Sequence, residues 1–172
     1  MNSVGAPTSA RSIATDRSSW LALAAWIIAI VAAGWIVGMV FAPDAWFARL
    51  SKPSWNPPGA LFGPVWTVLY LLMGVSIWLV RKQADASVQE RRVATHLFLL
   101  QLALNLAWTP LFFGLHSPLL AFVDICMLWG VVLWMAVEFG KIRPLAGYLL
   151  GPYLLWVSFA LVLNGTIGLM NG

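Results

Sequence analysis

The chain has 172 residues, and its composition differs from that of soluble proteins of this length. Apolar and aromatic residue types make up 61% of it and charged residues only 9%, whereas soluble domains have about 45–50% and about 25%. So few charges cannot cover the surface of a soluble protein, and the composition therefore predicts a membrane protein. The single cysteine excludes an intramolecular disulfide. The sequence has no cluster with metal-ligand spacing and no nucleic-acid-binding motif, so we expect neither a metal nor a nucleic-acid partner.

A membrane-spanning helix needs about 20 mostly apolar residues. Five segments meet or nearly meet this requirement, and they are residues 20–42, 60–80, 97–115, 119–137 and 145–170. They leave no room for a soluble domain, so the predicted fold class is an all-α integral membrane protein, a five-transmembrane-helix bundle over residues 20–172. Residues 1–19 are predicted to form a disordered tail. A signal peptide is disfavoured because the apolar run after Arg17 exceeds the usual length of about 7–15 residues.

The distribution of Lys and Arg predicts the orientation of the bundle. Eight of them fall in the tail, the second loop and the fourth loop, which share one side of a five-helix topology. The other side has only Arg49 and Lys52. Because basic residues concentrate on the cytoplasmic side, we expect the N-terminus inside and the C-terminus outside. The loop between the first two spans then faces outward.

Small residues recur four apart in three of the spans. The pairs are Gly34 with Gly38, Ala103 with Ala107, and Gly147 with Gly151. Such steps let helix backbones approach closely in lipid. Packing within the bundle is favoured for each pair, with a dimer interface as the alternative.

The loop between the first two spans, residues 43–59, combines prolines with tryptophans. Asp44 is a suitable N-cap for a short helix over the next residues. The segment from Lys52 to Gly59 contains three prolines, which prevent a continued helix and make the backbone rigid. Trp46 and Trp55 could anchor such a loop at the membrane interface. We favour the alternative, a lid over a cavity in the bundle, because a generic loop would be polar and flexible.

Aromatic and polar residues share helical faces in three spans. Trp66 and Tyr70 are four apart in the second span, Asn105 and Trp108 three apart in the third, and Tyr153 and Trp156 three apart in the fifth. Residues at these spacings lie on one face of a helix. Core packing explains one such pair, but three pairs with an intramembrane Asn favour a pocket for a flat apolar ligand.

Asp124 is the only acidic residue deep within a predicted span. Acids at this depth are expensive and usually face the protein interior. A structural or ligand-orienting role is favoured over proton transport, which normally needs several acids or histidines in series. His96 and His116 lie at the ends of the third span, so neither is placed as a haem ligand within the membrane.

Four motifs together resemble one family. Trp46-Phe47, followed by Lys52-Pro53-Ser54-Trp55-Asn56-Pro57-Pro58-Gly59, is similar to the loop signature of the TspO/MBR family, the tryptophan-rich sensory proteins and the translocator or peripheral benzodiazepine receptor proteins. The similarity continues through Trp66-Thr67-Val68-Leu69-Tyr70, through Gln101 to Asn105 with Trp108 to Gly114, and through Pro152 to Trp156. It covers about residues 20–170.

The resemblance implies a five-helix bundle, usually a homodimer, with a pocket beneath the first loop. It also implies binding of protoporphyrin IX or haem as a ligand, with no required cofactor, and of synthetic benzodiazepine-site ligands. By motif, Trp66 and Trp156 would be the pocket tryptophans, and the catalytic residues if the protein degrades porphyrin in light. Asn105 matches the pocket amide, Trp46 and Trp55 match the loop aromatics, and Asp124 matches an acid of similar bacterial proteins. The expected site is completed by Phe47, Tyr70, Trp108 and Tyr153.

Two departures from the family pattern affect the expected ligand. Phe47 replaces the more usual Tyr and removes a hydroxyl group. The chain after Tyr153 has no Lys or Arg, so the cholesterol motif that ends in a basic residue cannot be completed there. The function expected first is a membrane tetrapyrrole-binding protein that senses or regulates porphyrin level and stress. The alternatives are a light- and oxygen-dependent porphyrin-degrading enzyme and a tetrapyrrole or sterol transporter. The expected location of the protein is a bacterial cell membrane.

Overall fold

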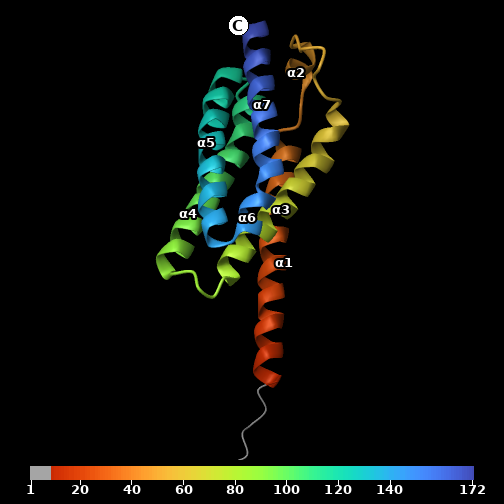
Figure 1. The fold of residues 1–172 in the computed structure, drawn as a ribbon. Helices are drawn as coiled ribbons and strands as arrows, with labels where there is room; N and C mark the ends of the chain where they lie inside the picture. Colours follow the sequence, from red (N-terminus) through yellow and green to blue (C-terminus); the bar gives the residue numbers. More distant parts are fainter. Residues whose placement is uncertain (1–8) are drawn as a thin grey trace, which may run out of the picture.

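The computed structural model describes the backbone of residues 9–172 and the side chains of residues 19–172. Within this range the chain forms helices and no strand. The elements in order are α1 (Ser9–Val40), α2 (Ala45–Arg49), η1 (Gly59–Leu61), α3 (Phe62–Lys82), α4 (Val88–Thr109), η2 (Pro110–Gly114), α5 (Pro118–Ile142), α6 (Pro144–Leu149) and α7 (Gly151–Asn171). Figure 1 shows α3, α4, α5 and α7 as a bundle, with α1 extending beyond it at the end opposite the C-terminus.

Five segments are long and apolar enough to cross a membrane, as the sequence predicts. They are Ser19–Val40, Gly59–Lys82, Val88–Gly114, Pro118–Ile142 and Pro144–Asn171. The bundle of five transmembrane helices is therefore confirmed. The helices exceed the apolar runs at several ends because polar and charged residues beyond these runs continue the helical backbone.

Two helices begin earlier than the apolar runs predict. α1 begins at Ser9, because no proline or glycine interrupts residues 9–19. The part of the expected disordered tail that covers residues 1–8 lies outside the described residues. α4 begins nine residues before the predicted start, because Ser87 and Glu90 form a capping box with bonds of 3.1 and 2.7 Å.

Prolines produce two irregularities in the spanning segments. Pro110 follows α4 and opens η2, a π-helical turn that continues the third span to Gly114. The fifth span is divided into α6 and α7 at Leu150, just before Gly151 and Pro152. Ser76 of α3 donates a 2.7 Å hydrogen bond to the carbonyl of Ala146 in α6, which attaches the shorter segment to the bundle.

Glycines allow close helix contacts at two of the predicted small-residue positions. A Cβ at Gly34 would overlap the ring of Tyr70, and a Cβ at Gly147 would lie 2.8 Å from Gly140 Cα. These two glycines therefore act in packing within the bundle. Gly38 and Gly151, their partners in the sequence pairs, have no atom within 4 Å of such a Cβ.

Candidate ligand-binding cavity

A cavity of about 410 Å³ lies within the bundle, at the end that carries α2. This volume falls in the range of small-molecule sites, about 300–1,000 Å³. Its lining comes from α1, the loop between α1 and α3, and from α3, α4, η2, α5 and α7. The aromatic lining residues are Trp35, Phe41, Phe47, Phe62, Trp66, Tyr70, Trp108, Phe112, Phe113 and Trp156.

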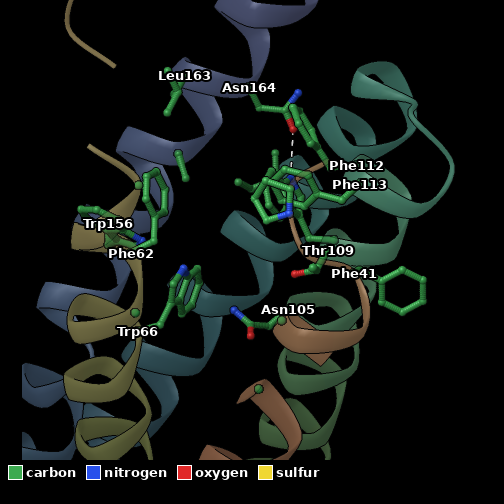
Figure 2. Close-up of a pocket in the computed structure, with 18 of the residues that line it drawn as sticks. Phe41, Phe62, Trp66, Asn105, Thr109, Phe112, Phe113, Trp156, Leu163 and Asn164 are labelled. Atoms are coloured by element: carbon green, nitrogen blue, oxygen red, sulfur yellow. Dashed lines mark hydrogen bonds between the residues drawn. The ribbon is translucent and has the colours of Figure 1, made fainter. Parts of the chain in front are cut away.

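Aromatic rings form two opposite walls of the cavity. On one side Phe62 and Trp156 meet edge to face with ring centroids 5.8 Å apart, and Trp66 lies beside them (Figure 2). On the other side Trp108 stacks on Phe112 at 5.0 Å with an interplanar angle of 20°. Flat aromatic ligands stack favourably on such rings, so the two walls favour a planar, largely apolar guest.

A chain of four buried polar side chains lies at the inner end of the cavity. The hydroxyl of Tyr70 donates to Asn105 Oδ1 at 3.0 Å, and Asn105 Nδ2 donates to the hydroxyl of Tyr153 at 3.1 Å. The Tyr153 hydroxyl in turn donates to Gln101 Oε1 at 2.9 Å. Tyr70 and Asn105 line the cavity, whereas Tyr153 and Gln101 lie behind it in the core.

Two further indole groups differ in their hydrogen bonding. Trp108 Nε1 donates to Asn164 Oδ1 at 3.0 Å, drawn as a dashed line in Figure 2, and Asn164 Nδ2 donates to the carbonyl of Pro118. Trp156 Nε1 is buried and has no hydrogen-bond partner among the described residues. The bond to Asn164 thus holds the Trp108 ring in the cavity wall. The Trp156 N–H is a donor without an acceptor among the described residues.

The predicted short helix in the first loop is confirmed as α2. Asp44 Oδ1 accepts hydrogen bonds from the backbone N–H groups of Trp46 and Phe47 at 3.0 and 3.1 Å, which makes it the N-cap. We call residues 43–59 the lid, because Pro43, Phe47, Asn56 and Pro57 all line the cavity.

The lid is joined to the turn between η2 and α5 by Asp44. Its Oδ2 lies 3.0 Å from Nε2 of His116, whose ring stacks on Trp46 at 4.5 Å. His116 has a positive φ of 51°, which is uncommon for a residue with a side chain. The Phe47 N–H bond, together with the neighbouring His116, holds the pKa of Asp44 below its ordinary value. The carboxylate is therefore ionised at neutral pH.

A second attachment joins the lid to the end of α7. Ser51 N donates to Asn171 Oδ1, and Asn171 Nδ2 donates to Ser51 O, both at 2.9 Å. Figure 1 shows α2 beside the C-terminal end of α7. Within the lid, Lys52 Nζ donates to the carbonyl of Leu50 at 3.1 Å and lies 4.4 Å from the centroid of the Phe47 ring. The lid is thus held at two separate points.

The sequence that forms this cavity and its lid matches one family over most of its length. The model of the TspO/MBR family matches residues 24–170. The chain belongs to the TspO/MBR family.

Known TspO/MBR proteins are similar in sequence to this chain over more than two thirds of its length. The tryptophan-rich protein TspO of Chlorobaculum tepidum is 45% identical over 130 residues, which are 75% of this chain and 82% of that protein. The human translocator protein is 42% identical over 119 residues, 69% of this chain and 70% of that protein. Protein CrtK of Rhodobacter capsulatus is 37% identical over 149 residues, 86% of this chain and 91% of that protein.

The structure brings six of the ten site residues expected for this TspO/MBR protein to the cavity wall. They are Phe47, Trp66, Tyr70, Asn105, Trp108 and Trp156. The other four do not line it. Trp46 packs on His116, Trp55 is 46% exposed with its ring 5.9 Å from Phe159, Tyr153 is fully buried, and Asp124 is buried with Oδ2 unpartnered among the described residues.

Several lining residues were not singled out from the sequence of this family member. Phe62, Phe112 and Phe113 form much of the walls, and Asn164 holds Trp108. Phe112 and Phe113 lie in the π-helical turn, so their direction does not follow from regular helical spacing. Asn164 is an intramembrane amide like Asn105, and that polarity was the one signal available for it.

Proposed function

We propose that this TspO/MBR protein binds a tetrapyrrole, protoporphyrin IX or haem, in the cavity and senses or regulates porphyrin level. The observation that carries the proposal is the pair of aromatic walls with the Asn105 amide between them. A planar macrocycle stacks on the walls, and the amide supplies a directional contact. The contacts that support this role are stacking on the lining rings and hydrogen bonding to the lining amide.

The test is a titration of the detergent-purified protein with protoporphyrin IX, followed by quenching of tryptophan fluorescence. We expect saturable binding in the micromolar range, about −8 kcal/mol. The Trp66→Phe, Trp156→Phe double variant removes two lining indoles and is expected to bind at least several-fold more weakly. Trp134→Phe is the matched control, because Trp134 is 55% exposed on α5 and lines no part of the cavity.

Two outcomes contradict this assignment. Equal dissociation constants for the double variant and the Trp134→Phe control would place the porphyrin outside the cavity. The absence of saturable quenching in the wild type would exclude protoporphyrin as the ligand, and the same titration with haem would then decide whether any tetrapyrrole binds.

The alternative function is light-driven oxidation of the bound porphyrin. It is supported by the position of Trp66 and Trp156 in one wall of the cavity. Molecular oxygen is the oxidant in this reaction. The excited porphyrin activates the oxygen, the activated oxygen adds to the macrocycle, and the neighbouring indoles can relay electrons between the two. Transport of a tetrapyrrole or sterol has no comparable support among the described residues.

We also propose that the protein is a homodimer in a bacterial cell membrane, with the N-terminus inside and the lid outside. The excess of Lys and Arg on the opposite side supports this orientation. A Ser51→Cys, Cys126→Ser variant tests it in intact cells, because Ser51 is an exposed lid residue. Labelling by a membrane-impermeant maleimide is expected, and labelling only after lysis would reverse the orientation.

A further inference from the structure

Gln101 is buried in the core, although only one of the two polar groups of its side-chain amide forms a hydrogen bond with the described residues. It is 0% exposed and lines no part of the cavity. Its Oε1 accepts from Tyr153, but its Nε2 has no partner among the described residues. A buried donor without a partner is destabilising, and an apolar side chain of similar size would avoid this. Packing alone therefore does not account for a glutamine here, and its accepting oxygen is the distinctive contribution.

The direction of the hydrogen bonds follows from that oxygen. A tyrosine hydroxyl has one hydrogen to donate, and Tyr153 directs it to Gln101 Oε1. Towards Asn105 the same hydroxyl can only accept, so Asn105 must turn its NH₂ group to Tyr153. The Asn105 oxygen then faces Tyr70, whose hydroxyl donates to it.

The second N–H of Asn105 remains available on the cavity side. Only one hydrogen of its NH₂ group is used in the bond to Tyr153. Figure 2 shows the Asn105 nitrogen turned across the cavity towards Trp66, and its oxygen turned away. The cavity wall thus presents an amide donor at this point.

We propose that Gln101 is a positioning residue that makes Asn105 a hydrogen-bond donor to the ligand, so that the cavity selects planar ligands with an acceptor atom. The inference rests on the proposed function only in taking the cavity as the ligand site, and it does not use the identity of the ligand. Without the Gln101 oxygen, the Tyr153 hydrogen turns to Asn105, and the amide rotates to receive it. The atom facing the ligand then changes from nitrogen to oxygen.

Two planar probes of nearly equal shape test this selection. Fluorenone has a ketone oxygen, and fluorene has a CH₂ group in its place. Their dissociation constants are measured by titration calorimetry in one detergent, so that the ratio between probes is compared across variants. We expect the wild type to bind fluorenone more tightly by about three- to tenfold, the effect of one hydrogen bond. The carbonyl stretching band of bound fluorenone should show hydrogen bonding.

Gln101→Leu removes the accepting oxygen, and the preference for fluorenone is expected to fall towards unity. The carbonyl band should move to the position of the free ketone. Gln101→Glu is the matched control, because its carboxyl group has the same shape and retains an accepting oxygen, and it should keep both the ratio and the band. If Gln101→Leu is not monodisperse, Gln101→Met is measured in the same way.

An unchanged ratio and band in Gln101→Leu would overturn the proposal, and so would the absence of any preference in the wild type. Failure of both probes to bind would overturn it as well. A wild type that prefers fluorenone but does not bind protoporphyrin or haem would support the role of Gln101 while contradicting the tetrapyrrole function. The two proposals can therefore fail separately.

Discussion

His116 Nε2 lies 3.0 Å from Asp44 Oδ2, which joins the lid to a turn 72 residues further along the chain. The same carboxylate caps α2 through its other oxygen. The Asp44 side chain thus caps the short helix and also attaches it to the turn that contains His116. The integrity of the lid and its attachment to the bundle therefore depend on the same ionisable group.

The first prediction concerns acid pH. Because the pKa of folded Asp44 lies below its ordinary value of 3.8, its stabilising contribution is present above pH 3.8 and is lost as the pH falls through the lower folded value. The protection factors of the Trp46 and Phe47 amides, measured by hydrogen–deuterium exchange, should fall over that window. Asp44→Asn keeps a capping oxygen without the titration, so its protection should not change with pH in this range. Equal pH dependence in both proteins would contradict the assignment.

The second prediction concerns the two attachments of the lid. His116→Ala removes the contact with Asp44, and Asn171→Ala removes both bonds to Ser51. Each variant should release protoporphyrin about two- to fivefold faster in stopped-flow experiments, as expected for exposed polar contacts. In the double variant the two free-energy effects should add, so that the two increases in release rate multiply, because the attachments share no partner.

Lys141→Ala is the control for these rates. Lys141 pairs with Glu138 near the end of α5 that is remote from the lid. A release rate that is unchanged in the His116→Ala, Asn171→Ala double variant would show that the lid does not gate the cavity.

The third prediction separates the two glycines of α1. Gly34→Ala places a methyl group into the ring of Tyr70, and we expect a loss of about 1–3 kcal/mol in the free energy of unfolding. Gly38→Ala meets no atom within 4 Å and should be neutral or slightly stabilising, because alanine favours a helix interior. Thermal unfolding in detergent, followed by circular dichroism, measures both. Equal losses would indicate that α1 packs elsewhere.

The fourth prediction tests the enzymatic alternative. The porphyrin complex is illuminated in air, and the Soret absorbance is followed. Loss of the band with formation of a product is expected for the wild type and for Trp134→Phe, but not for Trp66→Phe or Trp156→Phe, because the latter two remove indoles from the cavity wall. Identical bleaching in all four proteins would leave binding as the function.

The sequence predicts the elements of this fold well and their contacts poorly. Five apolar runs identify the five spans, and the Asp44 cap identifies α2, because both signals are local. The start of α4 was missed because hydropathy does not register a polar capping box such as that of Ser87. Tyr153 and Trp156 share a helical face by spacing, yet Tyr153 points into the core and only Trp156 reaches the cavity.

Long-range polar contacts account for most of what sequence reasoning could not supply. Trp108 and Asn164 are 56 residues apart, and Asn105 and Tyr153 are 48 apart. Neither contact leaves a pattern within one helix, because each depends on how two helices rotate against each other. Six of the cavity residues were therefore predictable as candidates, whereas the hydrogen-bond chain became visible only in three dimensions.

In the π-helical turn at Pro110–Gly114, the number of residues matters more for the position of the following side chains than the type of each residue. Successive residues of a regular helix are rotated by about 100°. Deleting one residue from this turn would let an ordinary helix form, but it would swing Phe112 and Phe113 relative to Trp108 and shorten the reach to His116. An insertion there would shift the same groups the other way. This segment should therefore tolerate exchange of one side chain for another of similar bulk far better than any change in length.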